Sequence, residues 1–221
     1  MASQKTCVIL GAGPGVGFAT ARRFAREGYA VVLAARRVTA IQPLVEDLVA
    51  QGFSASAVSV DCSSEASIRQ VIAACGSVDV LLYNAAGVTM AAPSIITPDQ
   101  LDHDLRVSIT GALVAAQAAA TSMRDTGTGT MLFTGGGFAL RPMASLVSLG
   151  VGKAGLRNLV FSLTEEFKPA GIRVGTFTIM GTVAPSTAFD PTLIAESFYS
   201  LHLDRQYGLG VEISFTGSSQ T

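Results

Sequence analysis

The chain has 221 residues, a length typical of a single α/β domain. Charged residues make up only 14% of it, against about 25% in an average domain, while 49% of its residues are hydrophobic. Lys and Arg total 15 against 16 Asp and Glu, and no basic run exceeds two residues, so composition excludes disordered chains and nucleic-acid-binding proteins. A surface this poor in charge favours a homo-oligomer.

Membrane spans, disulfides and metal sites are not expected. The longest weakly polar stretch, residues 107–123, is interrupted by Ser, Thr and Gln side chains and is shorter than an 18-residue apolar span. The three cysteines, Cys7, Cys62 and Cys75, are odd in number and lack CxxC spacing, which predicts buried thiols in a reducing cytoplasm. The two histidines are far apart in the sequence and do not indicate a metal site.

Short apolar or β-branched runs alternate with helical patterns along the chain. Seven strands are predicted, at residues 6–10, 30–34, 55–60, 79–83, 130–134, 172–179 and, less clearly, 211–215. This alternation is typical of a parallel sheet with helices on both faces. The expected architecture is a doubly wound α/β sheet in one domain, residues 1–221.

Three helices between these strands have clear sequence signals. Apolar residues recur at helical spacing over 41–48, with Gly52 as a stop. Thr97-Pro98-Asp99-Gln100 combines a capping Thr, a Pro in the first turn and a Gln three residues after the cap, which predicts a helix from there toward Met123. Asp190-Pro191 repeats this signal before a late helix at 193–203, within a segment, 182–210, that we expect to cover a ligand site.

A glycine-rich turn follows the first predicted strand directly and leads into a helix. Glycines at such a turn allow a tight bend and close approach of a diphosphate, while the helix N-terminus offers unpaired N–H groups. The strand, loop and helix context therefore predicts dinucleotide binding. The candidate residues are Gly11, Gly13, Gly15, Val16 and Gly17.

The second strand ends in Ala34-Ala35-Arg36-Arg37 and has no acidic residue to receive a ribose 2′-hydroxyl. Two guanidinium groups there can pair with a 2′-phosphate, which a carboxylate would repel. Arg36 and Arg37 therefore favour NADP(H) over NAD(H). The alternative is a solvated Arg pair that starts a surface helix.

With these motifs, and with Asp61 after the third strand, Asn84-Ala85-Ala86-Gly87 after the fourth and Lys153 further on, the chain resembles the short-chain dehydrogenase/reductase family. The resemblance implies a Rossmann fold over nearly the whole chain. It also implies an adenine contact at Asp61 beside Cys62, and support of the adenosine side by Asn84, Ala85, Ala86 and Gly87. Met180-Gly181-Thr182-Val183 resembles the family's Pro-Gly turn with Met in place of Pro, so Val183 is a candidate contact to the carboxamide.

The catalytic pattern implied by the resemblance is incomplete. The family uses a Tyr four residues before the Lys, a Ser after the fifth strand and often an Asn on the preceding helix. Here these positions hold Leu149, Gly136 and Ser108. Because a general acid contributes about 10² to 10⁴ in rate, ordinary carbonyl reduction is in doubt. Lys153 either still holds the cofactor ribose or is a solvated helix residue.

Several other groups are candidate replacements for the Tyr. Tyr199 and His202 share a face of the late helix, which in the family lies over the substrate pocket, but they also fit a packed Tyr and a solvated His. Ser148 and Thr134 are nearer in sequence, although an unassisted hydroxyl is a poor acid at neutral pH. The glycines at 135–137 either turn their N–H groups inward as an anion nest or form a flexible turn.

The leading hypothesis is an atypical NADP(H)-dependent oxidoreductase acting on a small apolar carbonyl, enone or imine, with a proton from water or the late helix. The alternatives are a non-redox isomerase, dehydratase or cyclase, and a nucleotide-binding pseudoenzyme or sensor. A homodimer or homotetramer is expected through the charge-poor helices at 101–123 and 145–168, the counterparts of which pack between subunits in the family. The expected partner is a small-molecule substrate, with neither nucleic acid nor membrane.

Overall fold

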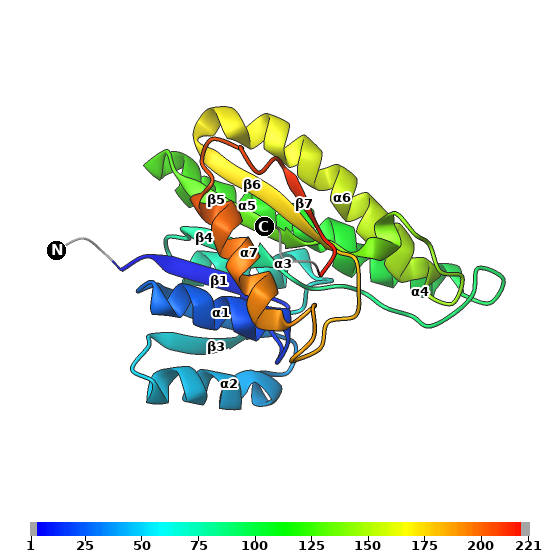
Figure 1. The fold of residues 1–221 in the computed structure, drawn as a ribbon, viewed down its shortest axis with the longest axis horizontal. Helices are drawn as coiled ribbons and strands as arrows, with labels where there is room; N and C mark the ends of the chain where they lie inside the picture. The colour runs from blue at the N-terminus through cyan, green and yellow to red at the C-terminus, as the bar shows by residue number, and fades with distance from the viewer. Residues whose placement is uncertain (1–3, 218–221) are drawn as a thin grey trace.

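Seven parallel strands form one sheet in the order β3-β2-β1-β4-β5-β6-β7 in the computed structural model, which describes residues 4–217 (Figure 1). The strands are β1 (Thr6–Leu10), β2 (Ala30–Ala35), β3 (Ala55–Ser59), β4 (Val80–Tyr83), β5 (Gly129–Thr134), β6 (Ile172–Ile179) and β7 (Glu212–Phe215). All seven predicted strands are confirmed within a residue or two, as is the doubly wound α/β class.

The strand order reverses at β1, which pairs with β2 on one side and β4 on the other. Leu10, the last residue of β1, lies opposite Ala34 and Tyr83, so these strands end at one edge of the sheet. In open α/β sheets, ligands bind outside the carboxyl ends of the strands at such a reversal. The topology therefore locates the site before any side chain is considered.

Helices cover both faces of the sheet because the central strands are buried on both sides. Cys7 and Ile9 of β1 belong to one hydrophobic core, whereas Val8 and Leu10 belong to the other. The first core lies under α1 (Val16–Arg26), α2 (Val38–Ala50) and α7 (Pro191–Leu203), and the second lies under α3 (Glu65–Ala74), α5 (Gly111–Thr126) and α6 (Val147–Phe167). Figure 1 shows α7 beside α1 on the same face of the sheet.

The helix predicted from Thr97 begins where the sequence indicates. The Thr97 side chain accepts from the N–H of Gln100, and the Gln100 side chain accepts from the N–H of Thr97, a reciprocal capping box. The helix α4 (Pro98–Leu105) then passes through a π-helical segment (Arg106–Thr110) into α5. Such π segments are often found at functional sites.

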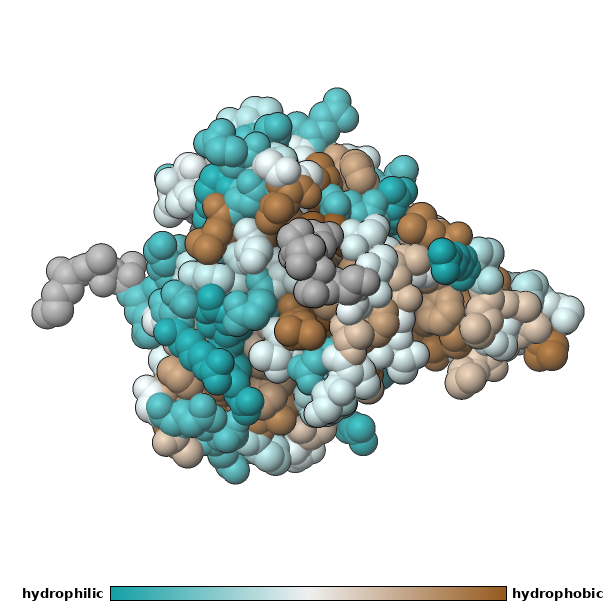
Figure 2. All heavy atoms as spheres, viewed as in Figure 1, coloured by the Kyte–Doolittle hydropathy of each residue, from teal (hydrophilic) through white to brown (hydrophobic). Residues whose placement is uncertain are grey.

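The chain segments that follow β4 and β5 project beyond the carboxyl edge of the sheet (Figure 1). An isolated parallel bridge between Ala91 and Leu146 joins them. Figure 2 shows that weakly polar and apolar residues gather on this projection, where Met90 and Ile95 are 80% and 72% exposed. Within the described residues, no helix combines the length and apolar character needed to cross a membrane.

Candidate functional site

The glycine turn after β1 is shaped by two different requirements. Gly11 has φ +84°, and a Cβ there would lie 2.4 Å from the backbone nitrogen of Ala85, so packing alone demands glycine. A Cβ on Gly13 or Gly15 would meet nothing within 4 Å. Gly15 is the N-cap residue of α1, and no side chain caps this helix end. The open space and the uncapped N–H groups fit a diphosphate.

A cavity of about 730 Å³ opens from this turn along the carboxyl ends of β1 to β4. Its lining brings together many of the predicted cofactor residues, namely Gly11, Gly13, Arg36, Arg37, Asp61, Cys62, Asn84, Ala85, Ala86 and Gly87. Gly15, Val16 and Gly17 continue the turn into α1 but are not part of the lining. The volume suits a small-molecule ligand.

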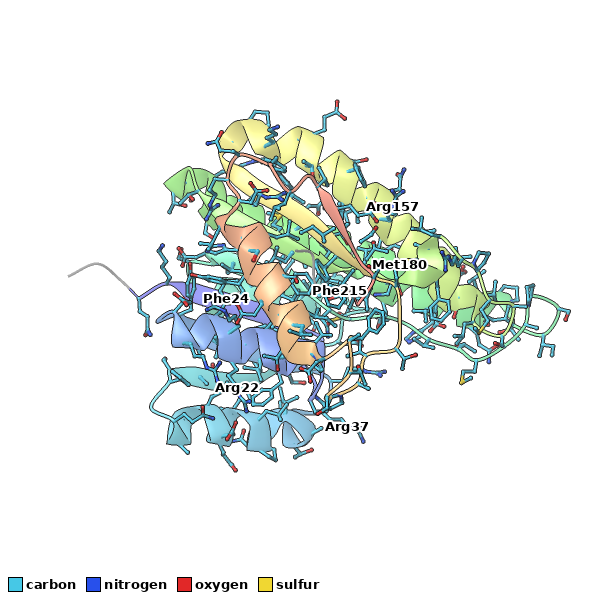
Figure 3. The ribbon with its side chains drawn as sticks, in the orientation of Figure 1. Arg22, Phe24, Arg37, Arg157, Met180 and Phe215 are labelled. Carbon is cyan, nitrogen blue, oxygen red and sulfur yellow. The ribbon has the colours of Figure 1, made fainter. Side chains whose placement is uncertain are left out.

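Charges of both signs meet at the β2 and β3 end of this cavity. Arg36 and Arg37 follow β2 and are exposed, and Figure 3 shows Arg37 at the carboxyl edge of the sheet. The Asp61 carboxylate accepts hydrogen bonds from the Ser63 N–H (2.9 Å) and hydroxyl (2.7 Å). These bonds, with smaller contributions from Arg36 and His103, lower the pKa of Asp61. Asp61 is therefore ionised at neutral pH.

Asn84 and Thr134 connect the glycine turn to the end of β5. The Asn84 amide donates to the carbonyl of Gly11 at 2.9 Å and accepts from the Thr134 hydroxyl at 2.7 Å. The Asn84 side chain thereby positions the Gly11 backbone, and the Thr134 hydroxyl positions the Asn84 side chain. Thr134, weighed as a proton donor, has its hydroxyl hydrogen committed to Asn84.

Lys153 lies inside the protein and not on a solvated helix face. Its Nζ donates to the Thr134 carbonyl at 2.5 Å, and its side chain runs past Gly136, where an added Cβ would lie 3.6 to 3.7 Å from the lysine carbons. Burial lowers the pKa of Lys153 from 10.5 to about 8. The Lys153 side chain thus lies beside Gly136, the position at which the family has its Ser, at the end of β5.

The rest of the catalytic region carries few polar side chains. Leu149, one turn before Lys153 on α6, is half-buried. Ser148 is fully buried, and its Oγ accepts the Thr89 N–H at 3.1 Å, so it holds the loop after β4. Val183 is 36% exposed in the segment after β6, outside the cavity lining. None of these three supplies an acid at the site.

The anion nest weighed for residues 135–137 is not formed. None of the three glycines has the left-handed φ that a nest requires, and the Gly135 N–H donates to the Phe133 carbonyl. Gly135 is instead demanded by packing, since a Cβ there would lie 2.8 Å from the Thr178 hydroxyl oxygen. These glycines let the chain pass closely over β6.

The late helix does not bring Tyr199 or His202 to the cavity, contrary to the expectation from the sequence. His202 is buried between the Tyr29 hydroxyl (Nε2, 3.0 Å) and the Thr130 hydroxyl (Nδ1, 2.8 Å). Tyr29 precedes β2 and Thr130 is the second residue of β5, so His202 lies at the amino ends of the strands, opposite the site. Tyr199 packs under Arg23, with the guanidinium 3.7 Å from its ring centre, and against Phe24, which Figure 3 shows on α1.

This placement has a physical reason. The helix α7 runs beside α1 from the carboxyl edge toward the amino edge of the sheet, and it also contacts β5 and β6. Burial lowers the pKa of His202 to about 4, so its ring is neutral at pH 7. Only the loop at the start of the 182–210 segment remains at the carboxyl edge. A proton donor from the late helix is therefore not supported.

Three residues of α4 and the π segment line the cavity and were not predicted to do so: His103, Asp104 and Val107. His103 is exposed at the rim of the cavity, whereas Asp104 is buried. The spacing of 103 and 107, and of 104 and 107, places them on neighbouring positions of one helix face. The helical spacing groups these residues on one face, but the sequence does not say which face of the helix meets β4.

The comparisons with known proteins agree with this geometry. A family model described as short chain dehydrogenase matches residues 5–190. Oxidoreductase asL5 of Sarocladium schorii is 32% identical over 179 residues, which is 79% of this chain and 70% of that protein. L-rhamnose 1-dehydrogenase (NAD(P)(+)) of Azotobacter vinelandii is 33% identical over 197 residues, covering 82% of this chain and 74% of that one.

Solved structures share the fold over almost their whole length. A metagenomic short-chain oxidoreductase in complex with NADP has a TM-score of 0.84 at 26% identity, covering 96% of each chain. A short-chain type dehydrogenase/reductase from Mycobacterium marinum has a TM-score of 0.88 at 23% identity, covering 97% of this chain and 94% of that one. The match to the family model spans most of the sequence, so this chain belongs to the short-chain dehydrogenase/reductase family of oxidoreductases.

Proposed function

We propose that this chain binds NADP(H) in the cavity at the carboxyl ends of β1 to β4 and acts as an atypical oxidoreductase on a small apolar carbonyl, enone or imine. The observation that carries the proposal is the cavity itself, in which the glycine turn, Arg36, Arg37 and Asp61 meet. When bound, the nicotinamide supplies hydride chemistry. One relative is named as an NAD(P)(+) enzyme and one similar solved structure is a complex with NADP, which supports the assignment.

Each part of the proposed site has a distinct task. The uncapped start of α1 binds the diphosphate, and Arg36 with Arg37 pairs with the 2′-phosphate, because planar guanidinium groups match phosphate oxygens. Val183 is proposed to contact the carboxamide through its backbone. Lys153 is proposed to hold the nicotinamide ribose, a task that needs its N–H donors and not a neighbouring Tyr.

The proton is proposed to come from water. Tyr199 and His202 lie at the opposite end of the sheet, and the hydroxyls of Ser148 and Thr134 are occupied by the Thr89 backbone and by Asn84. The exposed apolar residues on the loops after β4 and β5, such as Met90 and Leu140, favour an apolar substrate at this rim.

Leu149 and Gly136 favour a second reading. A site that lacks the family's acid and its hydroxyl donor also suits a non-redox enzyme, or a nucleotide-binding sensor without turnover. A homodimer or homotetramer through α4, α5 and α6, in the cytoplasm, is proposed for either case. Redox chemistry is what separates the two readings.

The test begins with NADPH binding, followed by fluorescence titration, and continues with single-turnover NADPH oxidation against a panel of carbonyls, enones and imines. Oxidation by the panel is expected for the leading proposal. Saturable NADPH binding without any oxidation would favour the sensor or the non-redox enzyme, and no binding would overturn nucleotide function altogether.

Leu149→Tyr restores a phenol one turn before Lys153 on the same face of α6. If the remaining geometry is competent, ketone reduction should rise by about 10² or more, the lower range for a general acid. Leu149→Phe is the matched control, since it adds the ring without the acidic hydroxyl. Equal rates for the two variants would show that the pocket is remodelled and not merely missing its acid.

A further inference from the structure

Asp104 on α4 is a buried carboxylate in the wall of the cavity. The residue is 4% exposed, and it lines the cavity with His103 and Val107. Its Oδ2 atom is buried and has no hydrogen-bond partner among residues 4–217. Buried carboxylate oxygens are almost always paired, because desolvating an unpaired charge is unfavourable. The unpaired Oδ2 atom of Asp104 therefore points to a hydrogen-bond donor that a bound ligand supplies.

The backbone around Asp104 is fixed, so the carboxylate cannot escape to solvent by a small shift of the helix. A Cβ on Gly87 would lie 2.3 Å from the Asp104 Cα and 2.6 Å from its carbonyl oxygen, which means that α4 rests directly on the loop after β4. The Gly87 N–H donates to the Ser108 hydroxyl at 3.0 Å and ties the same loop to the π segment. Asp104 is thus held against Gly87.

Asp61 also lines this cavity, and one of its carboxylate oxygens is already engaged in hydrogen bonds. Its Oδ1 accepts both the N–H and the hydroxyl of Ser63. That leaves Oδ2 as the acceptor for a ligand. A ligand group with two N–H donors in this part of the cavity would need a second acceptor, and the unpaired oxygen of Asp104 can be that acceptor.

NADP(H) has two groups of this kind, the adenine amine and the nicotinamide carboxamide, and the carboxamide is proposed to lie near Val183, outside the lining of this cavity. The exocyclic amine of adenine carries two N–H donors, whereas the ribose hydroxyls carry one donor each. We propose that Asp104 accepts a hydrogen bond from the adenine amine, alongside Asp61, and thereby makes the site selective for adenine. This assignment rests on the proposed nucleotide binding.

The experiment compares NADPH with its hypoxanthine analogue, which replaces the amine by a carbonyl oxygen, on the full chain and on Asp104→Val. A hydrogen bond to a charged group corresponds to about a tenfold or larger change in affinity. The variant should therefore bind NADPH about tenfold or more weakly than the unmodified chain, while its affinity for the analogue is unchanged or higher. Without the nucleotide, Asp104→Val should melt at least as high as the unmodified chain, because an unpaired buried charge has been removed.

Two further variants keep the assignment testable. Asp104→Asn retains an oxygen acceptor without the charge and should show an intermediate loss for NADPH. Asp102→Val removes an exposed carboxylate two residues away on the same helix and should change both affinities equally and slightly. An equal loss for both nucleotides in Asp104→Val, or no loss for either, would overturn the amine contact. If the unmodified chain binds neither nucleotide, the proposed function fails, and the Asp104 assignment fails with it.

Discussion

The two halves of the candidate site differ in how they are built. The half around β1 to β4 consists largely of backbone and small residues: a glycine turn, an uncapped helix and the loop 84–87. The half after β5 relies in the family on a few polar side chains, and here it holds Leu149 and Gly136, with the Lys153 side chain running past Gly136. A binding site that is shaped by backbone atoms is retained when side chains elsewhere are substituted. Proton transfer, by contrast, depends on individual side chains. Nucleotide binding and catalysis can therefore diverge independently.

The largest expected effect separates folding from binding within the glycine turn. Gly11→Ala places a side chain 2.4 Å from the Ala85 nitrogen in a left-handed conformation and should lower the free energy of unfolding by about 2–4 kcal/mol. Gly13→Ala meets nothing within 4 Å and should leave stability unchanged while weakening NADPH binding. Denaturant unfolding and NADPH titration of both variants check the contrast, which would fail if Gly13→Ala bound NADPH normally.

The next prediction concerns the pH dependence of stability that comes from Lys153, in the half of the site after β5. Its folded pKa, about 8, is below 10.5, so between these values the unfolded chain binds a proton that the folded chain does not. The Lys153 contribution to the free energy of unfolding should therefore rise with pH across this window, by up to roughly 3 kcal/mol, an upper bound from the shift. Lys153→Met should remove that rise. Burial raises the pKa values of the Cys7, Cys62 and Cys75 thiols, which contribute in the opposite direction at alkaline pH.

Unfolding measured at pH 7.5 and pH 10 tests the Lys153 prediction. Lys168→Met, which changes an exposed lysine just after the same helix, should keep the pH dependence of the unmodified chain. The same pH dependence in Lys153→Met and in the unmodified chain would contradict the buried, partly deprotonated amine described above.

The smallest expected effect tests the cofactor preference. Arg36→Ala removes one guanidinium beside the proposed 2′-phosphate and should weaken NADPH binding about tenfold, the lower range for a charge-assisted contact, with little change for NADH. Arg26→Ala removes an exposed arginine from the far end of α1 and serves as the charge control. Equal losses for NADPH and NADH in Arg36→Ala would refute a 2′-phosphate contact.

The sequence by itself determined the strands, the class of the sheet, the glycine turn and the gaps at positions 136 and 149, because hydrophobic period, caps and motif spacing are local properties. Only the tertiary structure decided where His202 lies, since the direction in which α7 packs on α1 is set by contacts between distant residues. The same holds for Asp104, whose burial depends on how closely α4 approaches Gly87. The role of a polar side chain depends on which hydrogen-bond partners the packing brings to it, and these partners come from residues that are distant in the sequence.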